Sequence, residues 1–315
     1  MENSIIEEIR FDDAEEFIQA ISYGGNLFNT FNSKCIYRGL SSDKYKLIPS
    51  ALRVEVKEEL CKLANQRNLT NDWEIAQIHI EFELLKSFYK CCDYNCLFIP
   101  NSVRLRESLV NSYKSFESLL SHEKWLPSDL LELAALAQHY GIPTRLLDWS
   151  YDFFVSLYFA VNGVAISNNP SNYFVIWIMN LNSVEYLISS GMPLRIINPP
   201  YFGNPNLGAQ KGVFTMWEID KPMNSSNPKI VDVEKKITKD ALDYSIQTYV
   251  NSNNPKLNTP LMHKILVSTK NIYKIHQFLE KMNYNASRIF PGYYGVVRSI
   301  FENSKWEDIK FIFTK

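Results

Sequence analysis

The sequence lacks three features that mark common functional classes. Basic and acidic residues nearly balance, with 33 Lys and Arg against 34 Asp and Glu, so no global positive charge indicates a nucleic-acid-binding protein. The apolar runs are far shorter than the roughly 20 residues that span a bilayer. The opening "MENSIIEEIRFDDAEEF" is acidic and has no long apolar core, unlike a signal peptide. We therefore expect a soluble, cytoplasmic protein that contacts no membrane, while a local basic patch stays open.

Cysteine is scarce and shows no disulfide framework. The chain has 5 Cys, an odd number, at positions 35, 61, 91, 92 and 96. Such a set favours reduced thiols in a cytosolic protein. Cys92-x-x-x-Cys96 could begin a zinc site, but no second Cys/His pair follows at the spacing of a zinc finger. We expect no bound metal.

Motifs of the common catalytic classes are missing as well. The stretch "GNPNLG" does not end in the Gly-Lys-Ser/Thr of a phosphate-binding loop. The chain has neither the Gly-x-Ser-x-Gly of a hydrolase elbow nor the His-Glu-x-x-His of a zinc protease. A Cys/His nucleophile pair stays open, although no local signature supports one.

The residues that are present indicate a folded protein with a large core. Hydrophobic residues make up 46% of the chain and aromatic residues 14%, which argues against a disordered chain. We find no internal repeat and no clear linker. The simplest interpretation is one α+β domain over residues 1–315, with a helical insertion at 55–125; a division into two domains is the alternative.

The first half of the chain shows mainly helical periodicity. "FDDAEEFIQAIS" predicts a helix capped by Asp12 or Asp13, and "CIYRGL" predicts a strand. Apolar residues in steps of three and four predict a long helix over 72–91, and another helix is expected within 103–121.

The second half alternates between helices and strands. We expect a helix over 130–140, capped by Ser128 or Asp129 and ended by Gly141 in the left-handed region. After an extended segment, Ser150 is expected to cap the next helix. Apolar runs predict strands, and amphipathic runs predict helices near the end of the chain; the strands are 173–179, 212–217 and 263–268, and the helices 271–282 and 291–301.

Two polar clusters are candidates for a site. Arg38 is followed directly by Gly39, so a guanidinium could meet a phosphate or carboxylate while the backbone approaches the ligand closely. The alternative is an Arg that is paired with a buried Asp and only holds the sheet together. In "QHYGIPTRLLDWS", residues 138–150, we expect His139 at a helix C-terminus that favours its cationic form. The helix that follows would offer an anion site at its N-terminus.

This second cluster also has a structural interpretation. Arg145 and Asp148 could form an internal ion pair, with Trp149 in the core, or they could face a ligand, with Trp149 as a stacking platform. A third stretch, "GAQKGVF", brings Gln210 to the edge of a strand, where it could touch a ligand or could belong to a plain turn.

Taken together, these motifs resemble the FRG domain family over roughly residues 15–300. Tyr37-Arg38-Gly39 is similar to the Phe-Arg-Gly motif that gives the family its name. The other motifs follow in order: "EFELLKSF", "LAQHYGIPTRLLDWSYDFFVSLYFAV", "AQKGVF" and "KILVSTKNIYKIHQFLEKMNYNASRIFPGYYG". The family often has an Arg a few residues before Ala-Gln-x-Gly, where this chain has Asn206. The family recurs in bacterial and phage proteins, so the resemblance implies an effector in a toxin or anti-phage defence system.

The same motifs are similar in order to those of the Arg-Ser-Glu class of ADP-ribosyltransferases. That resemblance implies a split, mostly antiparallel sheet flanked by helices, with NAD as co-substrate bound in the cleft. Arg38 would clamp the pyrophosphate or ribose. Thr144 and Arg145 would line the nicotinamide side.

The resemblance also assigns the remaining roles. Tyr140 or Trp149 would stack on a ring of NAD. Gln210 stands where the class has Glu or Gln, and an amide supplies no negative charge to the ribosyl cation. Asp148, or His139 as a base, would therefore have to contribute.

Three functions follow from this comparison. The first is an ADP-ribosyltransferase or NAD hydrolase, with a protein or nucleic acid as acceptor or with a cognate partner protein. The second is a non-catalytic module that senses a nucleotide, a nucleic acid or a phage protein. The third is a metal-free hydrolase or nuclease.

Overall fold

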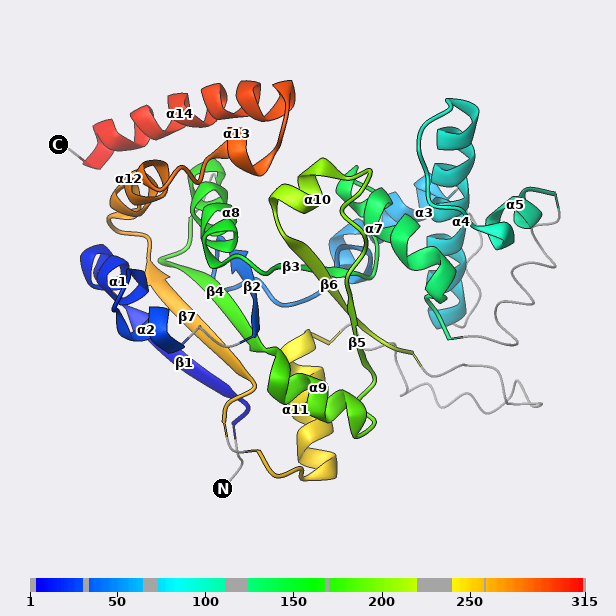
Figure 1. Cartoon of the computed structure of the whole chain (residues 1–315), viewed down its shortest axis with the longest axis horizontal. Helices are drawn as coiled ribbons and strands as arrows, with labels where there is room; N and C mark the ends of the chain where they lie inside the picture. The colour runs from blue at the N-terminus through cyan, green and yellow to red at the C-terminus, as the bar shows by residue number, and fades with distance from the viewer. Residues whose placement is uncertain are drawn as a thin grey trace.

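A mixed β-sheet organises the described part of the chain (Figure 1). The computed structural model describes residues 4–30, 34–64, 73–110, 124–167, 170–219, 240–257 and 259–313. Seven strands lie in the order β1-β7-β4-β2-β3-β6-β5. β1 runs parallel to β7 and every other neighbouring pair is antiparallel. The predicted α+β class and the mostly antiparallel sheet flanked by helices are confirmed.

The strands are short, and several coincide with apolar runs of the sequence. Their bounds are β1 Ile6–Phe11, β2 Cys35–Leu40, β3 Leu147–Ser150, β4 Tyr173–Asn180, β5 Leu194–Ile197, β6 Gly212–Trp217 and β7 Met262–Ser268. β4 lies between β7 and β2 and is buried on both faces, which explains its nearly continuous apolar sequence.

Alternate residues of the central strands enter two separate cores. On β4, Phe174 and Ile176 pack in a cluster with α1 (Ala14–Ile21), α8 (Phe153–Ile166) and α12 (Ile272–Lys281). Val175 and Trp177 pack on the other face with α9 (Leu181–Ser189) and α11 (Leu242–Asn253). The period-two alternation of a strand therefore supplies both helical layers.

A third core lies beside β6, where the remaining long helices gather. It joins α4 (Trp73–Tyr94), α5 (Val103–Val110) and α7 (Leu131–His139) to side chains of β6 such as Phe214. The described part of 55–125 is helical as predicted, and it also contains α3 (Lys57–Leu63). That this segment is an insertion within one domain stays a prediction. The part of the expected 103–121 helix beyond residue 110 lies outside the described residues.

The C-terminal segment covers α8 on its side away from the sheet (Figure 1). It consists of α13 (Ala286–Ile289) and α14 (Tyr293–Phe313), where the sequence predicts a helix over 291–301. The remaining short helices are α2 (Asn26–Thr30) and α10 (Pro205–Ala209). Of the helices in the described part of the chain, none is long and apolar enough to cross a membrane.

Two predicted helix caps are wrong. Ser128 and Asp129 belong to a short 3₁₀ turn, and α7 starts after Leu130 without a side-chain cap. Asp152, two residues after Ser150, caps α8 by accepting a hydrogen bond from the backbone N–H of Phe154. By contrast, Asp13 caps α1, and Gly141 has a φ of 96° after α7, both as predicted.

Candidate functional site

A cavity opens where β2 and β3 separate. The two strands share one register pair, Tyr37 with Ser150, so their halves of the sheet meet at a narrow joint. The cavity has a volume of about 480 Å³, within the roughly 300–1,000 Å³ of small-molecule sites. Its polar lining comes from β2, a short 3₁₀ helix at Ser50–Leu52, α7, β3, α8, the turn before β6 and α14. It comprises Arg38, Ser50, Gln138, His139, Asp148, Ser150, Ser156, Gln210 and Arg298.

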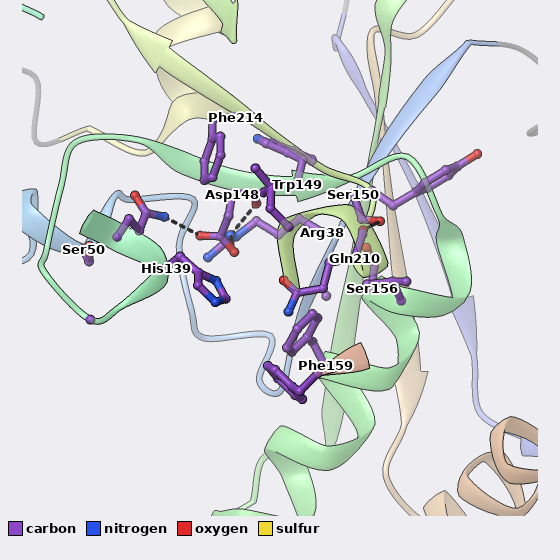
Figure 2. A pocket seen from close by; sticks show the side chains of 18 of the residues that line it. Arg38, Ser50, His139, Asp148, Trp149, Ser150, Ser156, Phe159, Gln210 and Phe214 are labelled. Carbon is purple, nitrogen blue, oxygen red and sulfur yellow. Dashed lines mark hydrogen bonds and ion pairs between the residues drawn. The ribbon is translucent and has the colours of Figure 1, made fainter. Parts of the chain in front are cut away.

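Arg38 and Asp148 form the centre of this cavity (Figure 2). The Arg38 Nη1 lies 2.7 Å from Asp148 Oδ2 and donates to the Asp148 backbone carbonyl at 2.5 Å. The guanidinium thus bridges the two strands just beyond their register pair. The Asp148 side chain is 62% exposed and that of Arg38 only 10%. The carboxylate therefore faces solvent, while the guanidinium is largely buried.

One buried donor at this centre has no partner. The Arg38 Nε makes no hydrogen bond. An unsatisfied guanidinium nitrogen that is buried costs on the order of 1–3 kcal/mol. A ligand that offers an oxygen to Nε would remove this cost, so the centre is suited to binding an acceptor group such as a phosphate.

A chain of hydrogen bonds fixes Asp148 from the side of α7. The Gln138 amide nitrogen donates to Asp148 Oδ1 at 3.2 Å, and the Thr144 hydroxyl donates to the Gln138 amide oxygen. Thr144 is itself buried, and its carbonyl accepts from the backbone N–H of Ala51 at 3.1 Å. Thr144 therefore acts on the centre through Gln138 and does not line the cavity.

His139 borders the cavity as a neutral imidazole. Burial lowers its pKa below the usual value of 6.5, so the predicted cationic form at the helix C-terminus is wrong. Its Nε2 lies 2.6 Å from the Nδ2 of Asn206. Asn206 is the residue that stands where the family often has an Arg. A neutral imidazole can accept a proton, which is what a general base requires.

Gln210 is held beside the cavity by contacts on both sides. Its backbone carbonyl accepts a hydrogen bond from the Ser150 hydroxyl at 2.7 Å, and its amide nitrogen donates to the Ile289 carbonyl at 3.3 Å. The next residue, Lys211, has a φ of 46° and pairs with Asp152 at 2.9 Å. Contacts with β3, with the Asp152 cap of α8 and with the C-terminal segment therefore fix the position of the Gln210 side-chain amide.

Gly39 is needed for packing, although it also lines the cavity. A Cβ at this position would lie 1.9 Å from the backbone carbonyl oxygen of Ser156 on α8. The glycine therefore permits α8 to approach β2 closely. Whether a ligand also approaches its backbone stays a prediction.

Arg145 faces away from this cavity and forms a buried ion pair with α4. Its Nε lies 2.6 Å from Glu81 Oε2 and its Nη2 3.0 Å from Glu81 Oε1. Trp125 and Gln77 also donate to the Glu81 carboxylate, at 2.6 and 2.8 Å. The alternative of an internal Arg145–Asp148 pair is wrong, because Arg145 pairs with Glu81 and Asp148 pairs with Arg38.

The expected aromatic platforms do not lie open in the cavity. Tyr140 is 65% exposed and is not among the lining residues. Trp149 borders the cavity, but its ring packs in the core behind the sheet and its indole nitrogen donates to the Thr215 hydroxyl at 2.9 Å. The expected anion site at the start of α8 is wrong as well, since the Asp152 carboxylate already caps that helix.

The comparisons with known proteins give one match. The sequence model of the FRG domain family matches residues 33–169. This chain contains an FRG domain. Among curated proteins and among solved structures no match was found.

The matched segment of the FRG domain supplies only part of the cavity. Arg38, Gln138, His139 and Asp148 lie within residues 33–169. The opposite part of the lining comes from later in the chain, and consists of Leu207, Gln210, Gly212, Phe214, Phe290 and Arg298. The joint between β2 and β3 therefore lies within the FRG domain, while the chain after it closes the cavity.

Several lining residues have no signal in the sequence of the FRG domain. Ser156 and Phe159 occur in the apolar run of α8, where they look like core residues. Phe290 and Arg298 lie more than a hundred residues from the central motif. Among the described residues, no group of His, Cys, Asp and Glu side chains is arranged to hold a metal ion, and no disulfide joins the described cysteines.

Proposed function

We propose that the cavity binds a nucleotide of the NAD class and that the protein cleaves the bond between nicotinamide and ribose. The observation that carries this proposal is the Arg38–Asp148 centre: a guanidinium with an unpartnered Nε next to an exposed carboxylate. Arg38 would bind a phosphate oxygen. Asp148 is the one carboxylate among the described residues that line the cavity, and it would face the ribose.

The chemistry follows from these two groups. When the C1′–N bond of NAD breaks, its electron pair leaves with nicotinamide, and positive charge develops on the ribosyl ring. The Asp148 carboxylate stabilises this charge by its negative charge. A hydroxyl of an acceptor, or water, then bonds to C1′ and gives its proton to the neutral His139 or to Asp148.

Release of nicotinamide from NAD tests the proposal. Asp148→Asn keeps the size of the side chain and an acceptor oxygen for Gln138, but it removes the charge and the acceptor that faces Arg38. We expect the rate to fall by about 100-fold or more, the usual effect of losing one electrostatic stabiliser of a transition state. Glu132→Gln is the matched control, because Glu132 is an exposed acid on α7, the helix that carries Gln138. Equal rates in the two variants would refute the role of Asp148.

A second candidate function is a nucleotide sensor without turnover. Gln210 favours it, because its amide supplies no negative charge to a ribosyl cation, and Arg38 and Asp148 already neutralise each other. A sensor would be stabilised by NAD, by about 2.7 kcal/mol at a ligand concentration of 100 Kd, without releasing nicotinamide.

An effector role in a bacterial toxin or anti-phage defence system belongs to the same proposal. It rests on the resemblance of the chain to a family that recurs in bacterial and phage proteins. Expression in bacteria should reduce growth or phage yield in a way that Asp148→Asn abolishes. If the variant acts like the unaltered protein, the effect does not come from this centre.

A further inference from the structure

The C-terminal segment contributes a second arginine to the cavity. Phe290 and Arg298, from the end of α13 and from α14, both line it. α14 is fixed to α8 by polar contacts: Tyr158 donates to Glu302, and the indole nitrogen of Trp306 donates to Asn162 at 2.8 Å. The position of Arg298 is therefore set by a helix that is itself firmly attached.

Two contacts hold the Arg298 side chain, and a third holds its partner Glu302. Its Nε donates to Glu302 Oε1 at 2.7 Å, and its guanidinium lies 4.2 Å from the centroid of the Phe290 ring. Glu302 is buried and is held in turn by the Tyr158 hydroxyl at 2.8 Å. Supported guanidinium groups lose little freedom when they bind a ligand, which favours binding.

The two arginines reach the cavity from different layers. Arg38 comes from β2 in the sheet, and Arg298 comes from α14, which lies beyond α8 (Figure 1). Figure 2 shows the Gln210 amide between Arg38 and Phe159. The Phe159 ring in turn contacts the Phe290 ring, at a centroid distance of 6.1 Å, and the Arg298 guanidinium packs on the Phe290 ring. Both arginines thus line the same cavity from different elements.

We infer that Arg298 is a second anion-binding residue of this cavity, and that the ligand carries an extended anionic group such as a pyrophosphate. The inference rests on the proposed function, because it concerns the same nucleotide. A single phosphate is bound by Arg38 alone. A nucleoside diphosphate or a dinucleotide also reaches Arg298, whose planar fork suits phosphate oxygens better than an ammonium group does.

The test compares AMP, ADP and NAD by calorimetric titration of the full chain. Arg298→Gln should weaken the binding of ADP and NAD by about tenfold or more, the effect of one lost charge-assisted contact. The binding of AMP should change less than about threefold, since its phosphate stays on Arg38. Retained AMP binding also shows that the variant is folded.

Arg288→Gln is the matched control. Arg288 lies in the same segment and covers an aromatic ring, that of Tyr284 at 3.8 Å, but it does not line the cavity. We expect it to bind all three nucleotides like the unaltered protein. Arg38→Gln should weaken the binding of all three.

Each contrary result has a separate meaning. If Arg298→Gln binds ADP within twofold of the unaltered protein while Arg38→Gln does not, the inference about Arg298 is overturned and the proposed function stands. If Arg298→Gln weakens AMP as much as ADP, the residue does not bind a second anionic group, which also overturns the inference. If the unaltered protein binds none of the three nucleotides, both the proposed function and the inference are overturned.

Discussion

Breaking the buried ion pair between Arg145 and Glu81 should strongly destabilise the protein. The two side chains are 2% and 4% exposed. Glu81→Gln removes the charge and leaves the Arg145 guanidinium buried without a counter-charge. Breaking a buried pair in this way costs about 3–5 kcal/mol, a large part of the roughly 5–15 kcal/mol that stabilises a typical protein.

The loss should be measured by urea and thermal unfolding. A cost of 3–5 kcal/mol lowers the Tm of a protein of this size by roughly 5–8 °C. Glu83→Gln on the same helix is the control, because Glu83 pairs with Lys86 at 2.6 Å where both side chains are 17% exposed. We expect a cost of less than about 1 kcal/mol there.

A double variant separates the charge from the packing. Replacing both Glu81 and Arg145 by Met removes the two buried charges together and should recover part of the loss. Recovery stays partial, since Trp125 and Gln77 lose the carboxylate to which they donate. A Glu81→Gln variant that loses less than about 1 kcal/mol would refute the reasoning and would reopen a ligand-binding role for Arg145.

Two further predictions concern the packing around the sheet and the C-terminal helix. Gly39→Ala should cost at least about 3 kcal/mol in urea unfolding, because its Cβ would lie 1.9 Å from the Ser156 carbonyl oxygen; a cost under 1 kcal/mol would contradict this packing role. Burial lowers the pKa of His276, which stacks on Trp306, from 6.5 to about 4. The unfolded chain therefore takes up this proton first, so stability is full above pH 6.5 and falls by about 3 kcal/mol as the pH drops to 4. His276→Phe should remove that part of the pH dependence, and an unchanged slope would argue against it.

The elements with strong periodicity were predictable and the weaker ones were not. α4 and β4 follow from steps of three and four and from a continuous apolar run. β1 was missed because its sequence, "IEEIRF", is rich in acidic residues and belongs to the edge of the sheet, where only one neighbour, β7, pairs with it. β5 was missed because it has four residues in a region rich in Pro and Asn. Whether a short edge strand forms depends more on the strand that pairs with it than on its own composition.

The centre of the site was predictable from the sequence, and its surroundings were not. Arg38 and Asp148, expected to share a site with Gln210, do line one cavity. The partner of Arg145 was missed because Glu81 lies 64 positions away. A signal existed, since Gln77 and Glu81 are two polar residues at a spacing of four beside the apolar face of α4. For Arg298 no local pattern distinguishes a ligand-binding arginine from one on a solvent-exposed helix.

The position of β2 and β3 in the sheet also determines which piece of the chain can be studied alone. A fragment cut at residues 33 and 169 would keep both strands and α8 but would lose β4, to which β2 pairs, and β6, to which β3 pairs. Both strands would then present bare edges, and the apolar faces of β2 and α8 would lose their cover. Such edges recruit strands from other molecules. Aggregation of this fragment would therefore reflect its boundaries, and the family match is a poor guide to a unit that folds by itself.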